Sequence, residues 1–199
     1  MPLAATRTSG FAFFISVPGA GVPPAETTID EACGEMTAAQ LQPEAIQQIV
    51  ALMHLEYQFA RAGRDWDEYA AAREKLVARM GRAPNTFPGT PNDPNWDSIR
   101  RFYFYDPAPT LWRLRVSTLA LFGGLDGNIL AAKNRAAWED ALRAGGNPDY
   151  TLLILPSADH MMLDAKVGNN AEMPSLQQFV PAYFPAVQGW LAKRVRGVN

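Results

Sequence analysis

Apolar runs of strand length alternate with helical stripes in the last third of the chain. Residues 116–122 and 150–155 are such runs, and each ends at a turn signal, two glycines at 123–124 and a proline at 156. Residues 129–144 and 176–195 each carry apolar side chains along one helical face. A strand–helix–strand–helix order predicts a parallel sheet with helices packed on its faces.

An earlier apolar run, residues 11–17, predicts one more strand. It is rich in aromatic and β-branched side chains and stops at the sequence PGAG, which is typical of a strand buried on both faces. Two prolines at 23–24 are expected to prevent a helix from starting at once. The run is short and only Arg7 precedes it, so we favour a strand over a signal peptide and expect a cytoplasmic protein.

The middle of the chain predicts helices. Two apolar stripes, within residues 46–60 and 66–80, are separated by Gly63, and Asp65 with Glu68 predicts a capping box. A loop rich in proline follows at 82–95, and then a short helix at 96–104. We therefore expect a helical insertion, 27–104, between two parts of one α/β unit, 1–26 and 105–199.

Composition excludes several classes of protein. The chain of 199 residues has a net charge of −2, which offers no basic surface to nucleic acid. It holds one cysteine and two histidines, too few for a disulfide framework or a typical zinc site. No apolar run approaches the roughly 20 residues of a membrane span. Neither a metal nor an organic cofactor is expected.

Two polar residues follow the predicted strands of the last third. Asp126 comes four residues after the run 116–122, and His160 comes five residues after the run 150–155. The carboxyl ends of parallel strands meet at one edge of a sheet, where functional residues gather. A carboxylate beside a histidine orients the imidazole and makes it a general base. Taken singly, Asp126 could equally belong to an Asp-Gly turn and His160 to a loop.

From residue 11 to 195 the chain resembles the C-terminal part of an α/β-hydrolase. It is most similar to the esterases and peptidases that resemble dienelactone hydrolase and prolyl oligopeptidase. The resemblance rests on residues 119–126 (LALFGGLD), the helix 134–145, residues 153–160 (LILPSADH) and the terminal pair Trp190-Leu191. Such enzymes often have glycine near the position of Asp159, so this loop departs from the pattern.

That resemblance implies a partial α/β-hydrolase fold, with about three parallel strands, flanking helices and a helical cap at 27–104. It implies that Asp126 is the acid and His160 the base of a catalytic triad acting on carboxylic esters or related acyl substrates. The aromatic residues Phe102, Tyr105 and Trp112 either line an apolar acyl pocket or bury the cap.

The nucleophile of such an enzyme has no match in the sequence. An α/β-hydrolase places its serine in a G-x-S-x-G turn, and the serines here, at positions 9, 16, 98, 117, 157 and 175, do not have this pattern. Residues 2–5 look like the helix that follows this turn, which would put the serine upstream of Met1. We therefore expect a truncated hydrolase that is nearly inactive alone, with an open sheet edge that a companion chain or a second copy covers. The alternative is a non-catalytic binding module on the same scaffold.

Overall fold

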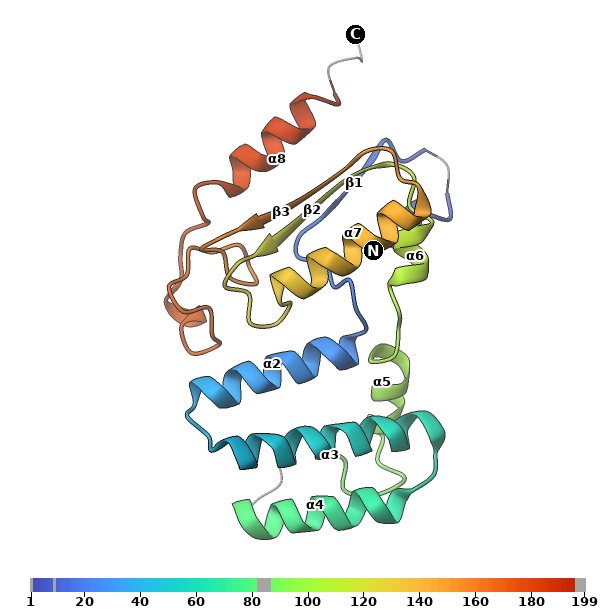
Figure 1. The fold of residues 1–199 in the computed structure, drawn as a ribbon, viewed down its shortest axis with the longest axis vertical. Coiled ribbons are helices and arrows are strands. Elements are labelled where there is room, and N and C mark those ends of the chain that lie inside the picture. Colours follow the sequence, from blue (N-terminus) through green and yellow to red (C-terminus); the bar gives the residue numbers. More distant parts are fainter. Residues whose placement is uncertain (1, 9, 82–86, 196–199) are drawn as a thin grey trace. The chain divides into compact units, whose positions relative to one another are not determined.

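The computed structural model describes residues 2–8, 10–81 and 87–195 (Figure 1). The chain divides into two compact units. One combines Met1–Val22 with Asp106–Asn199, and the other is Pro23–Tyr105. The first is an α/β unit and the second is helical.

The α/β unit is built on a three-stranded parallel sheet in the order β1-β2-β3. The strands are β1 (Phe13–Ser16), β2 (Ser117–Gly123) and β3 (Tyr150–Leu155). The central strand β2 is buried along most of its length, which explains its nearly continuous apolar sequence. The structure thus has the partial α/β architecture that the alternation of apolar runs predicts.

Helices cover both faces of this sheet (Figure 1). Leu119 and Leu121 of β2 pack with Trp190 of α8 (Tyr183–Ala192). The alternate residues, Ala120 and Phe122, pack with α6 (Ala108–Trp112) and α7 (Ala131–Gly145) on the other side. Because side chains alternate along a strand, one apolar segment supplies both layers of the core.

The segment after β1 is fixed to α7 by polar contacts. The backbone N–H of Gly21 donates to the side-chain oxygen of Asn134, which is fully buried, at 2.8 Å. The indole N–H of Trp138 donates to the carbonyl of Gly19 at 3.0 Å. These bonds pair backbone groups that would otherwise be buried without partners. A four-residue helix, α1 (Pro2–Ala5), precedes this part of the unit.

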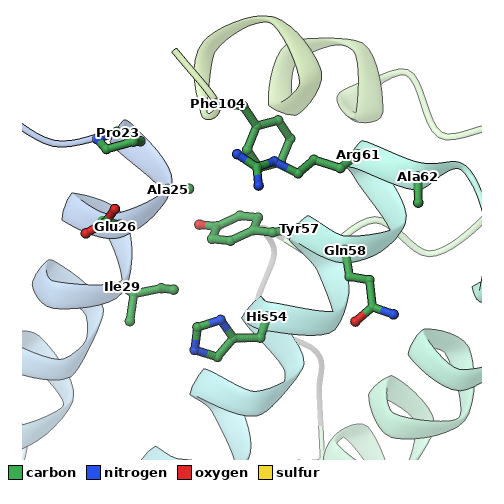
Figure 2. Close-up of a pocket in the computed structure, with 10 residues that line it drawn as sticks. All are labelled: Pro23, Ala25, Glu26, Ile29, His54, Tyr57, Gln58, Arg61, Ala62 and Phe104. Carbon is green, nitrogen blue, oxygen red and sulfur yellow. The ribbon is translucent and has the colours of Figure 1, made fainter. Parts of the chain in front are cut away.

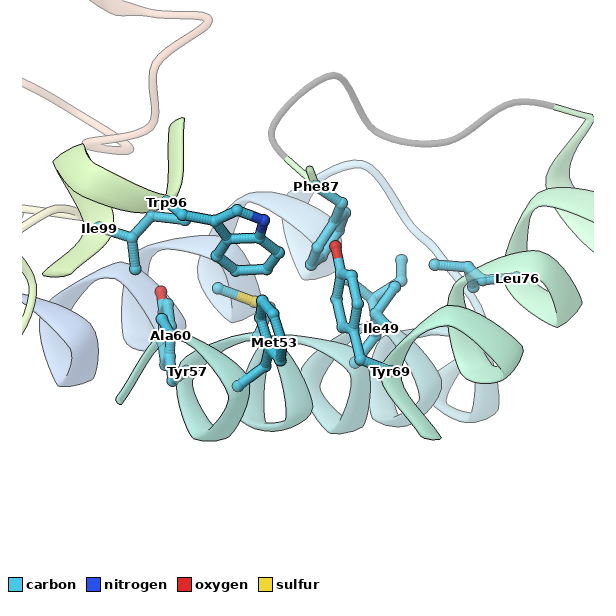
Figure 3. Close-up of a cluster of buried hydrophobic side chains, with 11 residues drawn as sticks. Ile49, Met53, Tyr57, Ala60, Tyr69, Leu76, Phe87, Trp96 and Ile99 are labelled. Carbon is cyan, nitrogen blue, oxygen red and sulfur yellow. The ribbon is translucent and has the colours of Figure 1, made fainter. Parts of the chain in front are cut away.

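The helical unit contains α2 (Pro24–Ala38), α3 (Pro43–Ala62), α4 (Trp66–Met80) and α5 (Asn95–Phe102). Both α3 and α4 end at a left-handed glycine, Gly63 and Gly81, and Gly63 is the residue that separates the two predicted stripes. Its core is a cluster of apolar side chains shown in Figure 3. Phe59 lies within aromatic contact distance of Tyr69 and Trp96, so α3, α4 and α5 share one core. In the described part of the chain, no helix is long and apolar enough to cross a membrane.

Some local predictions were wrong. Strand β1 covers only Phe13–Ser16 and is half-buried, because it is an edge strand paired with β2 alone. Helix α2 starts at Pro24, since proline is tolerated in the first turn. Asp65 lies in the left-handed region and makes no side-chain cap, so the predicted capping box is absent.

The C-terminal helix is also shorter than predicted, Tyr183–Ala192 in place of 176–195. Phe179 instead forms an antiparallel bridge with Leu163. Of the predicted loop 82–95, residues 82–86 lie outside the described residues, and the remainder is irregular up to α5.

Candidate active site

Asp126 lies in the turn that follows β2. Its side chain is fully buried, and Oδ1 accepts hydrogen bonds from the backbone N–H groups of Asn128 and Ile129, both at 2.8 Å. The turn itself closes through a bond from the N–H of Asp126 to the carbonyl of Gly123, at 3.2 Å. A buried carboxylate needs such partners, because an unpaired charge away from water is costly.

His160 lies in the turn that follows β3 and faces Asp126. Its Nδ1 atom is 3.0 Å from Oδ2 and 3.2 Å from Oδ1 of Asp126. We assign the ring hydrogen to Nδ1, because an ionised carboxyl group only accepts hydrogen bonds. The imidazole side chain is 32% exposed, whereas the Asp126 side chain is 0% exposed. The structure therefore brings together the two residues that the sequence singles out.

Two glycines allow the Asp126 and His160 turns to approach each other. A Cβ on Gly123 would lie 2.5 Å from the carbonyl oxygens of both Ala158 and Asp159. On Gly124 it would lie 2.4 Å from the carbonyl oxygen of Pro156. Any other residue would push the turns apart, so the glycine pair sets the spacing of the site as well as ending the strand.

Asp159 is a buried acid that sequence reasoning did not assign to the site. Its Oδ1 accepts the backbone N–H groups of Met161 and Leu163, at 2.8 and 2.7 Å. These bonds shape the turn around His160, where Met162 has a φ of 62°. Oδ2 of Asp159 is buried, and none of the residues that the structure describes forms a hydrogen bond with it. The sequence held one signal, an acid in place of the expected glycine directly before the histidine.

Glu172 fixes a second loop against the Asp126 turn. It lies just before a short 3-10 helix, Met173–Ser175, and accepts the backbone N–H groups of residues 166–168 at 2.8 Å each. The bond from Gly168, with those from its two neighbours, holds the pKa of Glu172 below its usual value. A Cβ on Gly168 would lie 1.9 Å from the carbonyl oxygen of Leu125, so the two backbones touch. No pattern in the sequence predicted these contacts of Glu172 and Gly168.

The three aromatic residues predicted for a substrate pocket are all at least one third exposed. Phe102 is 65% exposed, Tyr105 39% and Trp112 49%. Trp112 belongs to the α/β unit, where its indole N–H donates to the carbonyl of Ala144 at 3.1 Å. Phe102 and Tyr105 belong to the helical unit. None of them lines the cavities of the helical unit whose lining residues appear in Figures 2 and 3, and their role at a substrate pocket stays a prediction.

The helical unit contains cavities of ligand size that the sequence did not reveal. One, of about 470 Å³, is lined by His54, Tyr57 and Arg61 of α3 together with Phe104 (Figure 2). The Arg61 guanidinium lies over the Phe104 ring, 4.5 Å from its centroid. Another, of about 430 Å³, is apolar and contains Glu56.

No metal centre is found among the residues that the structure describes, since none of their His, Cys, Asp and Glu side chains form a group of three suited to an ion. A scan against protein-family models and searches of curated proteins and of solved structures found no match. The case for a function therefore rests on the geometry of the chain itself.

Proposed function

We propose that Asp126 and His160 are the acid and base of a serine hydrolase of the α/β-hydrolase type, acting on carboxylic esters or related acyl substrates. The observation that carries the proposal is the contact of 3.0 Å between His160 Nδ1 and a fully buried carboxylate oxygen of Asp126. Both residues follow neighbouring parallel strands, in the order acid and then histidine that nucleophile-elbow hydrolases use.

This geometry supports general acid–base chemistry at the other ring nitrogen. With the hydrogen on Nδ1 held by Asp126, the Nε2 atom is in the basic form that accepts a proton from a nucleophilic hydroxyl. The buried carboxylate stabilises the imidazolium that results and does not take the proton itself. The imidazolium then gives its proton to the departing alkoxide or amine, which leaves the acyl group on the serine. Water attacks this acyl group with the same histidine as base, and the histidine returns the proton to the serine as the acid is released.

The proposal places the nucleophilic serine outside these 199 residues. Ser157 donates to Oδ1 of Asp164 and Ser175 to the carbonyl of Glu172, so both hydroxyls have structural roles. Ser117 opens β2, at the end of the strand opposite to Asp126. Ser98 within α5 and Ser16 at the end of β1 lack the flanking glycines of an elbow, and Ser9 lies outside the described residues.

A further strand carrying that serine would pair with β1. Strand β1 is at the edge of the sheet, and its backbone groups on that side form a template for parallel pairing. The strand would come from a companion chain or from a longer product of the same gene. Self-association of the 199-residue chain through this edge is the competing arrangement.

The experiment is to read the DNA upstream of the Met1 codon and to express any longer product that it encodes. We expect an in-frame G-x-S-x-G segment, esterase activity, and labelling of its serine by a fluorophosphonate. His160→Ala should lower kcat by about 10⁴-fold or more, and His54→Ala, which removes the other histidine, should leave it unchanged.

Two results would contradict the proposal. One is strong ester hydrolysis by the 199-residue chain that survives His160→Ala. The other is an upstream sequence with its own start site and no such motif, together with a chain that fluorophosphonate does not label. The second result would favour a non-catalytic binding module.

A further inference from the structure

Every described residue that lines the cavity around Glu56 belongs to the helical unit. The cavity has a volume of about 430 Å³, within the range of small-molecule sites. Its walls include Ile49, Met53, Phe87 and Ile99, whose side chains are labelled in Figure 3. Such a surface suits the hydrocarbon part of a ligand, because contact with it removes apolar area from water.

Glu56 provides a polar group in this apolar wall. The residue is 5% exposed, and no hydrogen bond or ion pair joins its carboxyl to another residue that the structure describes. Buried carboxyl groups are normally paired, so an acid of this kind needs an explanation. Position 56 is also on the apolar stripe of α3, between Leu52 and Ala60, where an apolar side chain would be expected.

The other ionisable groups that line the cavity are also acids or phenols. Glu31 and Glu35 come from α2, Tyr57 from α3, and Tyr103 follows α5. Lysine, arginine and histidine are absent from the described residues of the lining. An anionic ligand such as a fatty acid would meet these acidic side chains, and a ligand without a polar group would leave Glu56 without a partner.

We propose that this cavity binds an amphipathic organic cation, whose hydrocarbon part packs against Met53 and its neighbours and whose ammonium group pairs with Glu56. The pairing gives a largely buried acid a partner of opposite charge. The proposal stands apart from the Asp126–His160 chemistry, since every residue it uses belongs to the helical unit.

Binding should be coupled to proton release. Burial raises the pKa of Glu56 to about 8, so the empty cavity holds a proton at neutral pH. A permanently charged ammonium group favours the ionised form of Glu56, so binding releases that proton. The affinity of the cavity for the cation should therefore rise as the pH approaches 8. Tyr57 and Tyr69, which face Glu56, stay neutral in this range because burial raises their pKa as well. On the α2 side, the ionisable groups of the described lining are Glu31 and Glu35.

Isothermal titration of the full chain with octyltrimethylammonium, below its micelle-forming concentration, tests the proposal. We expect one bound cation per chain, with octanoate and 1-octanol binding at least tenfold more weakly. Glu56→Gln should weaken the cation at least tenfold. Glu44→Gln, an exposed acid on the same helix, should leave its Kd unchanged. Titrations in buffers of different ionisation enthalpy should reveal the released proton at pH 7.

A second variant keeps the test decisive. Ala32 also lines the cavity, so Ala32→Phe should fill it and abolish binding while leaving Glu56 in place. Circular dichroism would show that each variant keeps its helices. Any of four results would overturn the proposal. The unaltered chain could fail to bind the cation, or could bind octanol as tightly as the cation. The cation could also bind Glu56→Gln or Ala32→Phe as tightly as it binds the unaltered chain.

Discussion

Replacing Glu56 by glutamine should change how the stability of the chain depends on pH. Burial raises the pKa of Glu56 from its ordinary 4.5 to about 8. Between these values Glu56 keeps a proton in the folded chain that it releases in the unfolded chain. The contribution of Glu56 to the free energy of unfolding is therefore highest below pH 4.5 and falls as the pH rises towards 8. A pKa difference of about 3.5, at about 1.36 kcal/mol per pKa unit, corresponds to roughly 5 kcal/mol. Glutamine is neutral throughout and removes this loss.

Urea unfolding followed by circular dichroism, at several pH values from 5 to 8.5, measures the effect. Taking the difference between Glu56→Gln and the unaltered chain at each pH cancels the other titrating groups. We expect the variant to gain stability steadily with pH, by several kcal/mol at the alkaline end. Glu44→Gln, its exposed counterpart, should show a flat difference. If the Glu56→Gln difference also stayed within about 0.5 kcal/mol at every pH, Glu56 would not be a buried acid.

Two further substitutions test the packing around the candidate active site. Gly123→Ala should lower the free energy of unfolding by about 1–3 kcal/mol, because its Cβ would lie 2.5 Å from two carbonyl oxygens. The control is Gly34→Ala inside α2, where a Cβ would meet nothing within 4 Å. It should raise the free energy of unfolding by about 0.5–1 kcal/mol. Thermal melts that rank the two alanines the other way would contradict this packing. Asn134→Ala removes the acceptor for the Gly21 N–H and should lower the free energy of unfolding by about 1–3 kcal/mol. Asn92→Ala, at an exposed position, should have a negligible effect. Equal urea midpoints for these two variants would contradict the bond between Asn134 and Gly21.

The central sheet was predictable because its signals are local. Strands β2 and β3 are uninterrupted apolar runs with a glycine pair or a proline at their ends, and the observed β3 matches the predicted 150–155. The extent of burial of β1 was not predictable, because it depends on which strands flank it. The C-terminal helix was overestimated because apolar residues before Tyr183 suit an irregular segment as well as a helix, as the bridge between Phe179 and Leu163 shows.

The candidate site was partly predictable for a related reason. Asp126 and His160 are found from the sequence since each follows a recognisable strand, and parallel strands bring their carboxyl ends together. Asp159 and Glu172 contribute by accepting hydrogen bonds from backbone N–H groups, and such bonds produce no repeating pattern in the sequence. Glu56 did have a signal, because it lies four residues after Leu52 and three after Met53 on the apolar stripe of α3.

The most direct test of the proposed acid–base pair is NMR spectroscopy of the two imidazole rings in the ¹⁵N-labelled chain. His160→Ala and His54→Ala assign the signals, since the sequence has two histidines. The account predicts that His160 carries its hydrogen on Nδ1, with a proton resonance far downfield that Asp126→Ala abolishes and that His54 lacks. A His160 ring that carries its hydrogen on Nε2, or whose Nδ1 proton exchanges with water as freely in the unaltered chain as in Asp126→Ala, would contradict it.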